Sequence, residues 1–237
     1  MPTESDYLNA FLAIRQGEAE HLETLLKAHP DLPNWRLAGP ARGRTPLHVV
    51  TDWPGYFPHG PRIAGRLLEA GADVDARGPD GSGETPLHWT ASSDDAAVAR
   101  VLIAGGADIE APGGSIGTPL DNAIGYGCWN VAHLLAERGA RVDKPWHAAA
   151  LGMLERLTEL LHADPAPGQD AVDQALWHAC AGGHRREAEL LVEFGADPGF
   201  TPDYGRGTLL DAASNHGTQR MNLIEWLEGL GIQRGDR

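Results

Sequence analysis

Two short motifs that recur in fixed phase constrain this chain more than any other feature. The first is T-P-L-H at residues 45–48 and 85–88, and T-P-L-D at 118–121. The second, G-A-D or G-A-R, begins at Gly71, Gly106, Gly139 and Gly195. In the second and third copies the two motifs lie 21 positions apart, and these copies begin 33 positions apart. Linked motifs in fixed phase predict an array of similar structural units.

Each unit is expected to contain two helices. Apolar residues between the motifs recur at helical spacing, as in Val98, Val101 and Leu102. The threonine that opens the first motif is a helix-capping residue, and the proline after it suits the first helical position. The glycine of the second motif fits a left-handed residue that ends a helix. Paired alanines at 148–149 and 212–213 would let neighbouring helices approach closely, so stacked units would share one core.

The motifs and their period resemble ankyrin repeats over residues 5–231. The resemblance implies an all-α solenoid of about five full or partial repeats, with an amino-terminal helix pair as its cap. We expect one domain over residues 1–237, with the cap at 5–30 and repeats near 43–76, 83–111, 116–142, 144–163, 172–198 and 206–231. The order of these elements also resembles a set of bacterial ankyrin-repeat proteins of undefined role.

The amino-terminal cap allows two more detailed predictions. Ser5 is expected to cap its first helix. Five leucines are expected to face the stack, namely Leu8, Leu12, Leu22, Leu25 and Leu26.

Charge and cysteine content narrow the classes of partner and compartment. The 19 Lys and Arg residues against 33 Asp and Glu residues give a formal net charge of −14. This balance disfavours nucleic acid and anionic membranes as partners. Two cysteines 52 positions apart suggest neither a disulfide framework nor a zinc site. We expect no metal or cofactor, and the lack of a secretory signal or a long apolar run favours the cytoplasm.

The repeat that begins at Thr45 carries an insertion. Its two motifs lie 26 positions apart instead of 21, and the five extra residues fall within 52–61, which we call the inserted loop. Three prolines and two glycines exclude a helix there, and the loop carries three aromatic residues. Two interpretations stay open. The loop folds onto its own repeat with Trp53 and Phe57 buried, or it forms the aromatic wall of a pocket.

Unusual residues also occupy helix positions that commonly face the groove of an ankyrin array. These combine aromatic rings with hydrogen-bonding groups, as a ligand site does, although the tryptophans could instead fill space beside glycines. The histidines of the first motif, His48 and His88, together with His147 and His184, are expected to be structural. The expected groove residues are Asp52, Trp53, Tyr56, His59, Trp89, Ser93, Asn122, Tyr126, Trp129, His178, Asn215 and His216.

Catalytic motifs give no support for an enzyme. The sequence lacks H-E-x-x-H, a Walker loop and a placed G-x-G-x-x-G. Residues 113–117 match the G-x-S-x-G of hydrolases, but they fall in a repeat hairpin, so no catalysis by Ser115 is expected. An acid–base site built from Asp52, Asp121, His59 or His178 is conceivable, yet nothing in their spacing requires it.

The sequence therefore predicts a non-catalytic binding module with an acidic, aromatic-lined concave groove. A protein partner is expected, with a basic or amphipathic segment lying in the groove. The alternative is a small-molecule or enzymatic site under the inserted loop, and a homo-oligomer that uses the same surface is a third interpretation.

Overall fold

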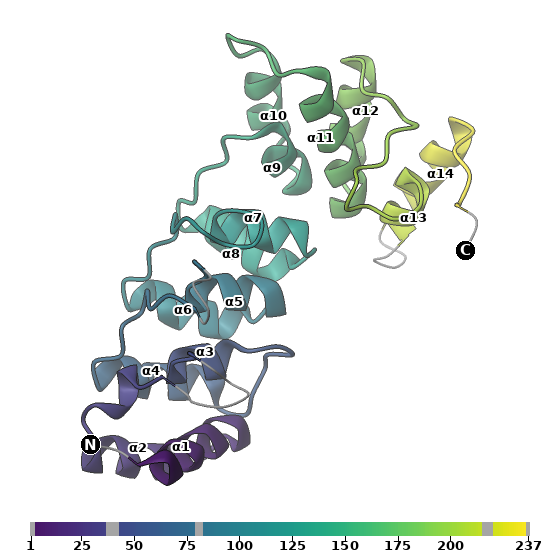
Figure 1. Cartoon of the computed structure of the whole chain (residues 1–237). Coiled ribbons are helices and arrows are strands. Elements are labelled where there is room, and N and C mark those ends of the chain that lie inside the picture. Colours follow the sequence, from purple (N-terminus) through teal and green to yellow (C-terminus); the bar gives the residue numbers. More distant parts are fainter. Residues whose placement is uncertain (1–2, 37–42, 79–82, 215–219, 236–237) are drawn as a thin grey trace. The chain divides into compact units, whose positions relative to one another are not determined.

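The structure is a computed structural model that describes residues 3–36, 43–78, 83–214 and 220–235. Every regular element within these ranges is a helix, as predicted (Figure 1). In chain order they are α1 (Glu4–Gln16), α2 (Ala19–Ala28), the 3-10 helix η1 (Leu32–Asn34), α3 (Pro46–Thr51), α4 (Gly60–Glu69), α5 (Pro86–Ser93), α6 (Ala96–Ala104), α7 (Pro119–Gly125), α8 (Trp129–Glu137), α9 (Pro145–Ala150), α10 (Leu154–Leu161), α11 (Gln169–Gly182), α12 (Arg185–Glu193), α13 (Leu209–Ser214) and α14 (Met221–Gly229).

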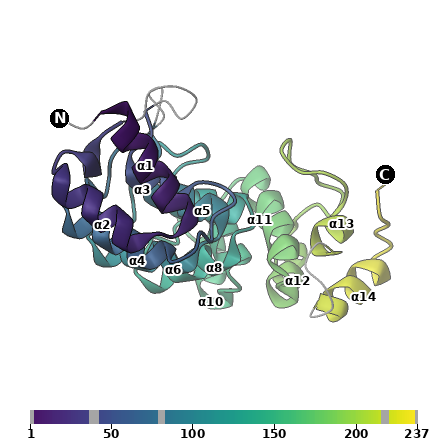
Figure 2. The same ribbon diagram turned by 90° about the horizontal axis from the view of Figure 1, so that it is seen from below.

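The chain forms two compact units, residues 1–140 (unit 1) and 141–237 (unit 2), each of which we describe by itself. In unit 1, one layer stacks α1, α3, α5 and α7, and a second layer stacks α2, α4, α6 and α8. Figure 2 shows α1 and α2 side by side at one end of this stack. In unit 2, α11 packs between α9 and α13, and α10 contacts α12. That both units form a single domain stays a prediction.

The first helix of each regular repeat in unit 1 begins as the first motif predicts. Thr45, Thr85 and Thr118 are N-caps, each followed by the motif proline in the first turn. Each makes a reciprocal capping box with the fourth motif residue, which satisfies backbone donors that the helix leaves free. In the third repeat this residue is Asp121, whose Oδ2 accepts from the Thr118 N–H at 2.8 Å. Aspartate can therefore replace histidine in the capping role.

The motif histidines also join adjacent repeats, which confirms their structural role. His48 and His88 are fully buried. The His88 Nδ1 accepts from the Thr85 N–H at 3.1 Å, so Nε2 carries the proton and donates to the Gly117 carbonyl at 3.1 Å. Burial lowers the pKa of His48 to about 4 and also lowers the pKa of His88, so both rings are expected to be neutral at pH 7.

The second motif ends its helices as predicted. Its glycines at 71, 106, 139 and 195 have φ between +89° and +101°, a region that favours glycine. Of the four alanines predicted to allow close helix approach, Ala148, Ala149 and Ala213 are 0% exposed and Ala212 is 4% exposed. The motif glycines therefore predict where helices end, and the paired alanines predict where helices pack closely.

Two predictions about the amino-terminal cap are wrong. The N-cap of α1 is Thr3, not Ser5, and it makes a capping box with Asp6. Leu8 and Leu12 are 55% and 41% exposed instead of facing the stack.

The apolar residues of α1 lie on two different faces, and only one of these faces is buried. Tyr7, Ala10 and Ile14 follow the helical period, and these three are buried. The face that contains Leu8 and Leu12 is rotated away from them. In α2 the prediction is confirmed for Leu22 and Leu26, whereas Leu25 is only half-buried.

Candidate binding site

The inserted loop follows α3, and its last two residues, Gly60 and Pro61, form the start of α4, so the exclusion of a helix is wrong at these two positions. The loop is fixed at both sides. Toward the following repeat, the Tyr56 N–H donates to Asp95 Oδ2 at 3.0 Å and the Tyr56 hydroxyl donates to the Asp94 carbonyl at 2.5 Å. Toward the cap, the Arg15 guanidinium lies 4.3 Å from the centre of the Phe57 ring. The loop thus connects the cap, its own repeat and the next repeat.

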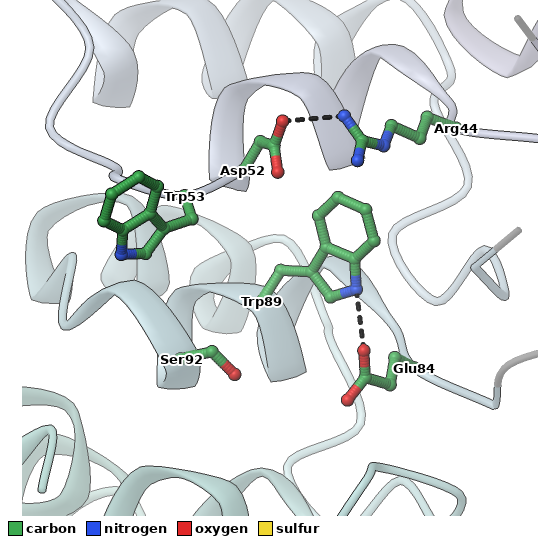
Figure 3. A pocket seen from close by; sticks show the side chains of 6 residues that line it. All are labelled: Arg44, Asp52, Trp53, Glu84, Trp89 and Ser92. Carbon is green, nitrogen blue, oxygen red and sulfur yellow. Dashed lines mark hydrogen bonds and ion pairs between the residues drawn. The ribbon is translucent and has the colours of Figure 1, made fainter. Parts of the chain in front are cut away.

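Two aromatic residues of the loop differ in burial, so neither interpretation of the loop holds for both of them. Phe57 is half-buried beneath Arg15, whereas Trp53 is 76% exposed, so burial of Trp53 in its own repeat is wrong. Trp53 instead lines a cavity of about 220 Å³ between the α3 and α5 repeats (Figure 3). We call it the tryptophan cavity; its lining residues are Arg44, Asp52, Trp53, Glu84, Trp89 and Ser92.

Trp89 is held rigidly in this cavity. Its indole Nε1 donates to Glu84 Oε2 at 3.1 Å. The ring edge of His48 approaches the indole with centroids 4.9 Å apart, and the Arg44 guanidinium lies 5.2 Å from the ring centre. A side chain with three such contacts loses little further entropy when a ligand binds. Trp89 is therefore a preorganised wall, while Trp53 exposes its ring to solvent.

The α3 side of the cavity carries a charge cluster. Arg44 Nη1 donates to Asp52 Oδ2 at 2.8 Å, and Arg15 lies 3.6 Å from the same oxygen. Two guanidinium groups around one carboxylate leave this wall with a net positive charge. Asp52 is thus in the predicted site, but its negative charge is offset within the protein.

Glu84 is the central residue of the opposite wall, and sequence reasoning missed it. Its Oε1 accepts from the Ser115 N–H at 3.0 Å and from the Asn122 side-chain amide at 3.2 Å, while Oε2 accepts from Trp89. All three donors are neutral. The carboxylate therefore accepts hydrogen bonds from two adjacent repeats, and none of these donors offsets its negative charge.

One signal in the sequence could have identified both charged walls. Arg44 and Glu84 directly precede the threonine of the first motif in adjacent repeats. The same position is Gly117 in the third repeat. Opposite charges at equivalent positions of neighbouring repeats indicate that this position faces a shared surface rather than the core.

Asn122 and Tyr126 organise the hairpin that precedes α7. Asn122 is fully buried, and its Oδ1 accepts from the Ile116 N–H at 3.0 Å. Tyr126 is 52% exposed, and its hydroxyl lies 2.9 Å from Ser115 Oγ. The predicted binding role is therefore open to Tyr126 but not to Asn122, whose amide is used within the protein.

Several other predicted groove residues of unit 1 do not line the tryptophan cavity. Tyr56 is 63% exposed and is bonded to the following repeat, and His59 is an exposed residue at the start of α4. Ser93 is half-buried against Gly55. Trp129 begins α8 and is half-buried, and a Cβ added to Gly127 would lie 3.9 Å from its ring.

The remaining predicted residues are not in unit 1. Asn215 and His216 lie outside the described residues. His178 belongs to α11 in unit 2, where it is 6% exposed. Its ring lies 4.9 Å from that of Trp146, and Nε2 is 3.0 Å from the Tyr204 hydroxyl. Burial lowers the pKa of His178 to about 4, so it is neutral at pH 7 and is not poised to donate a proton.

Three of the four candidates for acid–base chemistry have structural partners: Asp52 pairs with Arg44, Asp121 caps α7 and His178 faces Tyr204. The fourth, His59, is exposed at the start of α4. Within the described residues, no group of three or more His, Cys, Asp or Glu side chains is arranged to hold a metal ion.

No helix in the described ranges has the length and apolar character needed to cross a membrane. Cys128 and Cys180 are buried free cysteines, and burial raises the pKa of their thiols to about 11 and about 12.

Comparison with known sequences identifies the repeats. A family model of ankyrin repeats in three copies matches residues 56–145. Human ankyrin repeat and SOCS box protein 16 is 37% identical over 144 residues, which cover 44% of this chain and 30% of that protein. An ankyrin repeat and KH domain-containing protein of Caenorhabditis briggsae is 31% identical over 196 residues, 78% of this chain and 7% of that protein. The chain thus spans less than a third of the length of either relative.

Solved structures agree on the fold. The ankyrin repeat domain of human ASB11 matches with a TM-score of 0.53 and 22% identity, covering 91% of this chain and 96% of that one. The ankyrin repeat domain of Bcl-3, a member of the IkappaB family, matches with a TM-score of 0.54 and 24% identity, covering 93% and 98%. Likeness at this identity concerns the fold alone. With its recurring motifs, its helix pairs and the family model that matches residues 56–145, the chain contains ankyrin repeats and has their fold.

Proposed function

We propose that this chain is a non-catalytic module that binds a protein segment across the tryptophan cavity of unit 1. Its relatives are ankyrin-repeat proteins, whose repeats are typically protein-interaction modules. We further propose that residues 1–237 act as one domain in the cytoplasm, where a reducing environment suits two buried free thiols.

The observation that carries this proposal is the pairing of a fixed indole with an exposed one. Trp89 is held by Glu84 and His48, whereas Trp53 is 76% exposed beside the same cavity. Exposed aromatic rings next to a preorganised pocket are the usual hot spots of protein interfaces. Tyr56 and Tyr126, at 63% and 52% exposure, add aromatic surface in the same unit.

Cavity size favours a protein segment over the small-molecule alternative. The tryptophan cavity measures about 220 Å³. Small-molecule sites commonly occupy ~300–1,000 Å³ and enclose most of their ligand. A cavity with an exposed tryptophan at its edge suits one anchoring side chain of a longer segment, with the rest of the segment lying on the surface.

Charge favours a basic or amphipathic partner and opposes nucleic acid or an anionic membrane. The whole chain carries a formal charge of −14, which attracts cationic segments over long range. Near the cavity the charge is not uniformly acidic, because Asp52 is offset by Arg44 and Arg15 while Glu84 is not. The partner's basic group is therefore expected to approach the Glu84 wall.

Selection from a random-peptide phage library against the full chain tests this proposal. Peptides that bind the wild-type chain are expected to lose about 30-fold or more in affinity for Trp53→Ala, because truncating a hot-spot residue costs at least ~2 kcal/mol. Leu8→Ala removes another exposed apolar side chain, 55% exposed on α1, and should leave affinity unchanged. Selected peptides that bind both variants as tightly as the wild type would place the binding surface elsewhere.

A further inference from the structure

We propose that the tryptophan cavity is specific for a lysine side chain of the bound segment, whose ammonium group binds Glu84. This inference rests on the proposed function and adds the chemistry of the anchoring residue. It follows from the order of groups along the cavity, from the free hydrogen-bonding capacity of Glu84 and from its charge.

The cavity changes character along its length. In Figure 3, Trp53 lies to one side of Trp89 and Glu84 lies at the nitrogen-bearing edge of the Trp89 indole, so the lining passes from one indole to a second and then to a carboxylate. A matching occupant is apolar along its stem and positively charged at its tip. Lysine has this construction, with an alkyl stem that packs on apolar surface and an ammonium that extends beyond it.

Glu84 retains limited capacity to accept another hydrogen bond. An ionised carboxylate offers about four lone-pair sites. Ser115 and Asn122 use two of them at Oε1, and Trp89 uses one at Oε2. One site therefore remains, at the oxygen that already faces Trp89. A single ammonium N–H can use it, whereas the two-pronged pairing that favours arginine would need both oxygens.

The charge of Glu84 has no cationic partner among the described residues. Its three contacts come from an indole, an amide and a backbone N–H. The facing cation, Arg44, is instead paired with Asp52 at 2.8 Å. The Glu84 wall thus offers a negative charge that internal contacts orient but do not neutralise, as recognition of an ammonium group requires.

Peptide pools with one fixed central residue test the inference on the intact chain. The centre is lysine, acetyl-lysine, arginine, norleucine or glutamate between random flanks, and binding to the immobilised full chain is measured. The lysine pool is expected to bind about tenfold or more above the norleucine and acetyl-lysine pools, as expected of one hydrogen bond to a charged group. It should also exceed the arginine and glutamate pools.

Two charge variants locate the effect. Glu84→Gln is expected to reduce the lysine pool to the level of the norleucine pool. Glu20→Gln changes the net charge equally at a residue of α2 that pairs with Arg62 at 2.8 Å and does not line the cavity. It should keep the lysine preference, which excludes a general charge effect.

The possible failures are distinguishable. Pools that bind equally well whatever their centre, and that all lose binding to Trp53→Ala, would overturn the lysine inference and leave the proposed function intact. An arginine pool as strong as the lysine pool would overturn the choice of ammonium. Pools that bind equally to wild type and Trp53→Ala would overturn both. The comparison among pools on the wild-type chain remains decisive even if Glu84→Gln disturbs Trp89.

Discussion

Replacing Leu102 with alanine is expected to lower the free energy of unfolding by about 2–5 kcal/mol, as for other buried leucines. Leu102 is fully buried in α6, which packs between α4 and α8. Truncation removes apolar contacts and leaves a cavity that rigid neighbouring helices cannot close completely. Urea denaturation of both proteins, followed by circular dichroism, measures the difference.

The matched control is Leu8→Ala, which removes the same atoms from a side chain that is 55% exposed. It should change the free energy of unfolding by less than about 0.5 kcal/mol. A loss below about 0.5 kcal/mol for Leu102→Ala would mean that the repeat phase is misplaced. A large loss for Leu8→Ala would mean that α1 buries the face first expected from its leucines.

Gly17→Ala is expected to destabilise the protein by more than about 2 kcal/mol, through backbone strain and overpacking together. Gly17 ends α1 with φ of +78°, where a side chain is strained. An added Cβ would also lie 2.6 Å from the Cβ and carbonyl oxygen of Pro58, so the inserted loop must move. The measurement is again urea denaturation, together with the affinity for a library-selected peptide, which should fall because Trp53 belongs to this loop.

Gly106→Ala separates the two causes. Gly106 has φ of +93°, but a Cβ added there meets nothing within 4 Å. It should therefore show the strain of a left-handed backbone alone, about 1–2 kcal/mol, with peptide affinity unchanged. Equal losses of stability and affinity for the two variants would show that contact between Gly17 and the inserted loop does not support the site.

The fold could be predicted because its determinants are local. Caps at Thr45, Thr85 and Thr118 act on N–H groups within the same helix turn, and the glycines of the second motif set their own backbone conformation. Such signals are read from a few adjacent residues. The predicted buried face of α1 was wrong because Tyr7, Ala10 and Ile14 pack inward, and the leucines alone do not determine which face of a helix packs against its neighbours.

The candidate site was predicted less completely because its contacts join residues far apart in the sequence. The inserted loop is held by Tyr56 contacts to Asp94 and Asp95, 38 and 39 positions away. Glu84 acts through Asn122, also 38 positions away. Aromatic residues in an insertion indicated where a site could form. The sequence did not show that Trp53 would stay exposed or that Asn122 would be buried.

The most direct test of binding at the tryptophan cavity is a ¹⁵N–¹H NMR titration of the full chain with a library-selected peptide. The indole N–H signals of individual tryptophans report the bound surface. We expect the signals of Trp53 and Trp89 to shift as peptide is added, while those of Trp177 and Trp226 in unit 2 stay in place. Shifts confined to Trp177 and Trp226, with Trp53 and Trp89 unchanged at saturation, would contradict this expectation.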